Sequence, residues 1–125
     1  MAQKKTQKVE KVEHTIDASG KTLGRVASEA AKALMGKTKA DYTPHIRSDV
    51  HVKIINAKKL YVRDAKRRTK VYQNYSGYPG GLRSETFKEL AARRGYGAPL
   101  KRAIERMLPR NTFRTPRLKN LEITE

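Results

Sequence analysis

The sequence contains no cysteine, no tryptophan and few acidic residues. Without cysteine the chain can form no disulfide, offers no thiolate to a metal and has no cysteine nucleophile. No apolar run approaches the roughly 20 residues that a membrane-spanning helix needs. The N-terminal stretch MAQKKTQKVEKVE also lacks the apolar segment of a secretion signal. These absences favour a soluble intracellular protein with no membrane partner.

Positive charge is what the sequence has in excess. Its 125 residues include 29 Lys and Arg but only 12 Asp and Glu, which gives a net charge of +17. Self-repulsion of this size opposes compaction unless an anionic partner neutralises it. Nucleic acid, whose phosphates carry dense and fixed negative charge, is the partner that this composition favours.

The first half of the chain has the pattern of a βαβ unit. Apolar residues over 23–34 recur at spacings of three and four, which is typical of one buried helix face. Gly36 follows at a position where helices often end in a left-handed residue. Strands are predicted on either side of this helix, at 13–17 and 49–56, and the second of them has the apolar pattern of a largely buried strand.

Further strands and helices are expected in the second half. Strands are predicted at 59–62 and 70–76, joined by the basic connection RDAKRRTK. A helix is predicted over 84–94 with Ser84 as its N-cap, and another over 98–108, ended by Pro109.

These elements suggest one folded domain with basic ends. We expect a mobile basic arm over residues 1–12, an α/β domain over 13–110, and an extended basic tail over 111–125 that lies along a partner.

The segment DASGKTLGR, residues 17–25, raises the question of a phosphate loop. A nucleotide P-loop requires another glycine five residues before Gly20, where the sequence has Thr15, and the dinucleotide fingerprint lacks its third glycine. Lys21 and Arg25 instead flank the predicted start of a helix, where backbone amides and the helix dipole favour an anion. An ordinary tight turn with solvated charges is the alternative. In a chain this basic, we favour a backbone phosphate.

Two later loops combine cations, aromatic rings and glycines. The stretch KTKADYTPHIR places Tyr42 and His45 among lysines, a combination suited to looped RNA, although Tyr42 is as readily explained as a packing residue. The stretch VYQNYSGYPGGL gathers tyrosines around glycines that permit close backbone approach. Tyr72, within the predicted strand, is equally well explained as packed on the sheet.

Basic side chains are densest late in the sequence. Residues 93–119 contain nine Lys or Arg against Glu105 alone, and residues 58–70 form a second cluster against Asp64 alone. Arginine suits bidentate phosphate contacts. No paired-carboxylate or Ser-His-Asp arrangement is apparent, and the three histidines show no metal-ligand spacing. The sequence thus predicts no catalytic residues, no metal and no cofactor.

Several ordered blocks resemble one known family. DASGKTLGRVASEAAKALMGK, YTPH, INAKKL, KVYQNYSGYPGGL, TFKELAARR and AIERMLP occur in the order found in the bacterial-type family of large-subunit ribosomal protein thirteen. The similarity covers roughly residues 14–110. It implies a three-layer α/β/α domain around a four-stranded parallel sheet, and a non-enzymatic role in the large ribosomal subunit.

The resemblance implies large-subunit rRNA and neighbouring large-subunit ribosomal proteins as partners, with no small-molecule substrate. It also implies a role in early subunit assembly and translation, in the cytoplasm or in an organelle ribosome. Two alternatives stay open: a nucleotide-binding enzyme of doubly wound fold, and a DNA- or regulatory-RNA-binding protein working off the ribosome. The residues expected to bind rRNA are Lys21, Arg25, Lys37, Lys39, Tyr42, His45, Lys70, Tyr75, Gly77, Tyr78, Gly80, Gly81, Arg93, Arg94, Lys101, Arg102, Arg106, Arg110, Arg114 and Arg117.

Overall fold

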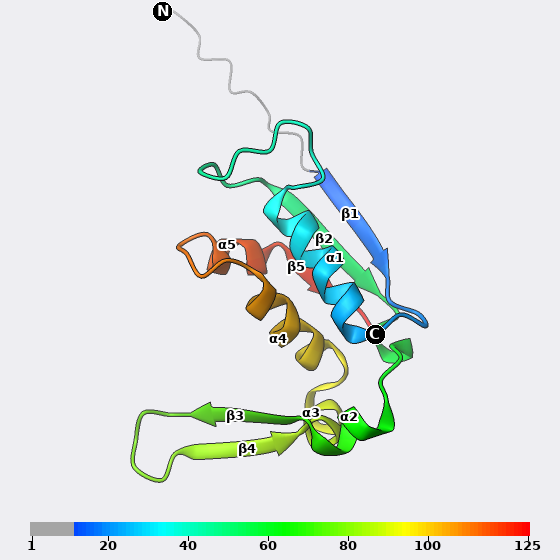
Figure 1. The fold of residues 1–125 in the computed structure, drawn as a ribbon, viewed down its shortest axis with the longest axis vertical. Helices are drawn as coiled ribbons and strands as arrows, with labels where there is room; N and C mark the ends of the chain where they lie inside the picture. The colour runs from blue at the N-terminus through cyan, green and yellow to red at the C-terminus, as the bar shows by residue number, and fades with distance from the viewer. Residues whose placement is uncertain (1–11) are drawn as a thin grey trace, which may run out of the picture.

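The computed structural model describes residues 12–125 (Figure 1). The predicted basic arm therefore lies outside the described residues, except for Val12. The elements in chain order are β1 Val12–Asp17, α1 Leu23–Met35, β2 Val50–Ile55, the 3-10 helix η1 Ala57–Lys59, α2 Asp64–Thr69, β3 Val71–Tyr75, β4 Leu82–Thr86, α3 Phe87–Arg94, α4 Gly97–Met107, α5 Arg114–Lys119 and β5 Leu121–Ile123.

The predicted βαβ unit is present as β1, α1 and β2. Strands β1 and β2 are parallel and paired from Val12 with Val50 to Asp17 with Ile55. Helix α1 begins after Thr22 and ends at Gly36, whose φ of 81° is the left-handed conformation expected there. On its other edge, β2 pairs in parallel with β5, so the sheet order is β1-β2-β5.

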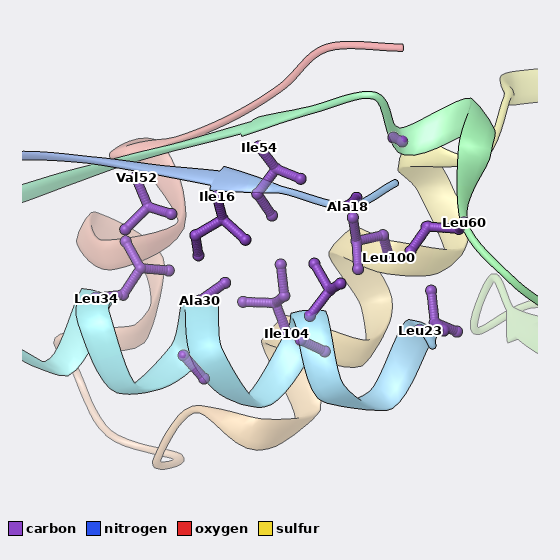
Figure 2. Packing of buried hydrophobic residues seen from close by; sticks show 14 of the residues in the cluster. Ile16, Ala18, Leu23, Ala30, Leu34, Val52, Ile54, Leu60, Leu100 and Ile104 are labelled. Atoms are coloured by element: carbon purple, nitrogen blue, oxygen red, sulfur yellow. The ribbon is translucent and has the colours of Figure 1, made fainter. Parts of the chain in front are cut away.

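The parallel sheet has one buried and one exposed face. Ile16, Ile54 and Ile123 are register partners on the face that packs against the helices, and Ile16 and Ile54 are almost fully buried. Figure 2 shows their neighbours Leu34 and Ile104 pointing up from the helices toward this face. Thr15 and Lys53 pair on the opposite face and are exposed. The packing observed is therefore a helical layer on one side of a sheet.

The expected four-stranded parallel sheet in a three-layer α/β/α domain is not confirmed, since the parallel sheet has three strands. Asn56, with a left-handed φ of 58°, ends β2 and leads into η1, so the predicted strand at 59–62 leaves the sheet. It contributes one isolated parallel bridge between Thr22 and Tyr61. The strand predicted at 70–76 does form, as β3, but it pairs antiparallel with β4 in a separate hairpin.

Helix α3 starts later than predicted. Ser84 lies in β4, and the N-cap is Thr86. The Thr86 hydroxyl accepts the backbone N–H of Glu89 at 3.3 Å, and the Glu89 carboxylate accepts the N–H of Thr86 at 3.1 Å. This reciprocal capping box satisfies two amides that the helix itself leaves unpaired, whereas Ser84 is held in the β4 ladder.

Residues 111–125, predicted as an extended tail, contain α5 and β5. The backbone N–H of Thr124 donates to the carbonyl of Ile54 at 2.8 Å, which extends the pairing of β5 with β2. The side chain of Glu125 accepts the N–H of Tyr96 at 3.0 Å and so brings a carboxylate to the start of α4. The basic connection RDAKRRTK likewise contains helix α2.

Helix α4 joins the sheet domain to the hairpin. Its buried residues Leu100 and Ile104 pack with α1 and the sheet in one hydrophobic cluster (Figure 2). Tyr72 of β3 and Phe87 of α3 belong to the same cluster, with ring centroids 6.4 Å apart. The hairpin, although separate from the parallel sheet, is thereby anchored to the main core.

Replacing Thr86 should test the revised start of α3. We expect Thr86→Ala to lower the free energy of unfolding by about 1 kcal/mol, because the capping hydrogen bond is lost. Ser84→Ala, two residues earlier on exposed β4, should change it by less than about 0.5 kcal/mol. Urea denaturation measures both values. A larger loss for Ser84→Ala would contradict the capping assignment.

Candidate nucleic-acid interface

The glycine loop between β1 and α1 uses its own backbone amides internally. The N–H groups of Ala18, Gly20 and Lys21 donate to the carbonyls of Ile55, Lys59 and Ala18, at 3.0 to 3.2 Å. Gly20 has a φ of 71°, which explains the glycine. A phosphate-binding loop needs such amides directed at its ligand. Here they are occupied, so this loop is a structural turn and not a nucleotide cradle.

Asp17 completes this turn. Its carboxylate accepts the backbone N–H of Ser19 at 3.0 Å and the side-chain amide of Asn56 at 3.1 Å. The hydrogen bond from Ser19 and then that from Asn56 hold the pKa of Asp17 below its ordinary value of 3.8. An ionised carboxylate at this point further disfavours a phosphate inside the loop.

The start of α1 remains accessible to an anion. Thr22 stands at the N-cap without a side-chain capping hydrogen bond, and no acidic residue occupies the first turn. Arg25 is exposed there, while Lys21 is exposed and forms an ion pair with Glu29 at 3.3 Å. This helix end borders a depression of about 180 Å³, lined by Thr22, Leu23, Gly24, Tyr61, Val62, Arg63 and Lys66.

A second depression, of about 210 Å³, adjoins the first. We call it the Tyr72 cleft; its lining residues are Leu23, Lys66, Lys70, Tyr72, Arg102, Ala103, Arg106 and Met107. Lys70 Nζ lies 5.6 Å and Arg102 Cζ 5.2 Å from the centroid of the Tyr72 ring. Burial raises the pKa of the Tyr72 hydroxyl, with Arg106 and then Arg102 acting in the opposite direction. Cations from α2, from its C-cap Lys70 and from α4 therefore gather at one buried tyrosine.

Basic residues continue beyond the cleft along α4 and α5. Arg102 also donates to the side-chain oxygen of Asn74 at 3.1 Å. Arg114 forms an ion pair with Glu105 at 3.6 Å and, with exposed Arg110, borders a broad depression of about 490 Å³. The predicted residues Lys70, Arg102, Arg106, Arg110 and Arg114 thus lie along one stretch of surface.

The tyrosine and glycine loop connects β3 to β4 at the tip of the hairpin. Tyr75 and Tyr78 are 66% and 76% exposed, so their rings are available to a partner. Gly77 and Gly80 both have positive φ, 86° and 74°. At Gly81 a side chain would collide with Ser76. These three glycines are therefore required by the turn itself.

The loop after α1 lies at the opposite end of that helix from the hairpin (Figure 1). It carries the predicted residues Lys37, Lys39, Tyr42 and His45, of which only Lys39 is half-buried. Helix α1 has 13 residues, so its ends are roughly 20 Å apart at 1.5 Å per residue. The predicted site residues consequently form two separate surfaces.

The remaining predicted residues differ in accessibility. Arg94 and Lys101 are exposed, and Arg93 forms an ion pair with Glu85 at 2.6 Å. Arg117 is buried, with its guanidinium 5.5 Å from the centre of the Phe113 ring. Because α5 packs against the domain in place of the expected tail, Arg117 is not presented to a partner.

Sequence reasoning missed two cations of this surface. Arg63 lines the depression at α1 and Lys66 lines both depressions, but in the sequence they are only members of the basic cluster over 58–70. The signal that relates them is their spacing of three residues, with Arg63 as the N-cap of α2 and Lys66 in its first turn.

Among residues 12–125, no helix is both long and apolar enough to cross a membrane. In the same residues, no group of three or more His, Cys, Asp or Glu is arranged to hold a metal ion.

Comparison with known proteins gives consistent matches. The family model described as Ribosomal protein L13 matches residues 11–125. "Large ribosomal subunit protein uL13" of Borrelia turicatae is 48% identical over 115 residues, covering 92% of this chain and 76% of that protein. The protein of the same name from Treponema pallidum is 44% identical over 110 residues, covering 88% of this chain and 77% of that protein.

The hydrogen bonds of Asp17 predict a contribution to acid sensitivity. Because the pKa of Asp17 is lowered by folding, its contribution to stability is complete above the ordinary value of 3.8 and is lost as pH falls through the folded pKa. We expect NMR titration to show this lowered pKa. Asn56→Gly, which keeps the left-handed backbone but removes the amide donor, should move the pKa upward. A pKa unchanged by Asn56→Gly would contradict the assignment.

Proposed function

The chain belongs to the ribosomal protein L13 family, a family of structural ribosomal proteins and not of enzymes, and from this we propose that it is a constituent of the large ribosomal subunit. We further propose that it binds large-subunit rRNA through phosphate contacts, supports early subunit assembly, and works in the cytoplasm beside neighbouring ribosomal proteins. The relatives from Borrelia turicatae and Treponema pallidum are both named as large-subunit proteins.

The observation that best supports rRNA binding is the arrangement of cations at α2, its C-cap and α4. Lys66, Lys70, Arg102 and Arg106 share one depression that no acidic residue lines. In a chain of net charge +17, such a surface needs an external source of negative charge. The rRNA backbone supplies it, and each neutralised phosphate releases condensed counterions.

The two separate surfaces suggest how the protein supports assembly. The loop with Lys37 and Tyr42 and the surface around Tyr72 lie at opposite ends of α1. A rigid helix between them would hold two rRNA segments at a fixed separation. The exposed rings of Tyr75 and Tyr78 add faces on which unpaired bases stack. The protein therefore acts as a clamp between RNA segments and requires no catalysis.

Sedimentation tests the ribosomal assignment. We expect the protein in a cell extract to co-migrate with large subunits in a sucrose gradient at high salt, because many phosphate contacts act together. The purified protein run without ribosomes is the control and should stay near the top. Recovery from the extract only in the free pool would instead support a DNA- or regulatory-RNA-binding role off the ribosome.

A salt series tests the phosphate mechanism. Binding to a large-subunit rRNA fragment should weaken steeply with salt, with a log–log slope of roughly −0.7 to −0.9 for each phosphate neutralised. Filter binding measures the slope. A fragment of the same sequence with an uncharged peptide backbone is the control and should bind far more weakly. A flat salt response together with equal binding of the control would contradict the mechanism.

A further inference from the structure

The Tyr72 cleft brings four cations to one buried tyrosine, and no acidic residue lines it. Its four cations are Lys66 of α2, Lys70 at the C-cap of α2, and Arg102 and Arg106 on successive turns of α4. Some cations outside the cleft have carboxylate partners, such as Lys21 with Glu29 and Arg93 with Glu85. Among residues 12–125, none of the four cleft cations forms an ion pair.

Two of the four cations are also held in place. Lys70 and Arg102 both lie over the ring of Tyr72, whose own side chain is buried in the core. Arg102 is further oriented by its hydrogen bond to Asn74. Contact with a ring face attracts a cation but does not neutralise it. The free protein therefore holds mutually repelling charges in one place, which costs stability at low ionic strength.

The size of the cleft limits its occupant. Its volume of about 210 Å³ lies below the roughly 300–1,000 Å³ typical of sites for whole small molecules. Leu23 and Met107 add apolar surface to its lining. Such surroundings strengthen charge interactions relative to open water. A small, compact anion fits these properties better than a nucleotide.

We propose that the Tyr72 cleft binds one backbone phosphate of RNA, clamped by Lys66, Lys70, Arg102 and Arg106. The proposal rests on the proposed function and makes it specific, since it names one anchoring point on a broad basic surface. Arg102 and Arg106 supply planar donors for the phosphate oxygens, and the two lysines supply point charges. Tyr72 is a positioning residue, because Lys70 and Arg102 lie over its ring.

Neutralising exposed members of the cleft tests this proposal. Lys66→Gln and Arg106→Gln change side chains at the surface, so the fold should persist. Each should weaken binding to a large-subunit rRNA fragment by about tenfold near 0.1 M salt, as expected for one charged hydrogen bond to phosphate. The matched control is Lys32→Gln, an exposed lysine nine residues after Leu23 along α1. It removes the same charge away from the cleft and should change affinity by less than threefold.

Thermal unfolding of the free protein supplies a second readout. At low ionic strength, Arg106→Gln should raise the midpoint of unfolding because it relieves repulsion within the cleft. Lys32→Gln should leave it unchanged or lower it, because Lys32 lies in the last turn of α1 where a cation is favourable. Replacing a residue needed only for structure would lower both the stability of the free protein and its affinity for RNA. Replacing a side chain that binds phosphate should lower the affinity but raise the stability.

The outcomes distinguish a failure of the proposed rRNA binding from a failure of the proposed phosphate site. If the wild-type protein fails to bind rRNA, the proposed function itself is wrong. If it binds, but Lys66→Gln and Arg106→Gln lose no more affinity than Lys32→Gln, the phosphate clamp is wrong and the broader proposal stands. If millimolar inorganic phosphate raises the midpoint of thermal unfolding equally in the wild-type protein and in Arg106→Gln, the cleft is likewise not the phosphate site.

Discussion

The contact between α4 and α1 is the interaction on which both the core and the charged surface depend. Leu100 and Ile104 of α4 are completely buried in the cluster that joins α1 to the parallel sheet. On the remaining side of the same helix, Arg102 and Arg106 line the Tyr72 cleft. Burying one face of α4 therefore fixes the position of the cations on the other. The hydrophobic effect, which carries no directional information of its own, here determines where charge is presented.

The ion pairs of the described residues do not balance that charge. Those formed by Lys21, Arg93 and Arg114 join exposed or half-buried groups at 2.6 to 3.6 Å. Surface pairs of this kind contribute about 0–1 kcal/mol each. The domain is thus stabilised mainly by its apolar cluster, and its cations stay available for a partner. This arrangement suits the proposed role of the protein in binding RNA.

Local patterns predicted the elements whose burial follows a simple period. Helices α1 and α4 and strand β2 were predicted close to their observed bounds, because each carries a regular apolar stripe. Strand β1 was also predicted close to its bounds, although Ile16 is its one buried residue. Strand β5 has only three residues within a polar stretch, so its place in the sheet depends on pairing with distant β2. The burial of Arg117 likewise depends on a tertiary contact, the packing of α5 against the domain. The capping box of Thr86 and Glu89 is a local signal that marks the start of α3 better than Ser84 does.

The candidate site was predictable only in part, for a related reason. The sequence identified Arg102, Arg106 and Lys70 as members of basic clusters, but charge density says nothing about which cations converge. The cations converge on Tyr72 only because β3 pairs with β4 and not with the parallel sheet. The residue pattern at 70–76 predicts a strand but not which strand it pairs with. In the glycine loop the sequence suggested a phosphate site that the structure does not form. The backbone amides of Gly20 and Lys21 are bonded within the protein.

The position of β5 has a consequence for how the chain is made. Strand β2 is central in the sheet, yet its partner β5 follows every other described element along the chain. During translation the basic helix α4 therefore leaves the ribosome before β2 acquires its second neighbour. Until then one edge of β2 has unpaired backbone groups, a feature that invites association with other nascent chains. In the proposed role, early binding to RNA would keep nascent chains that still lack β5 apart from one another.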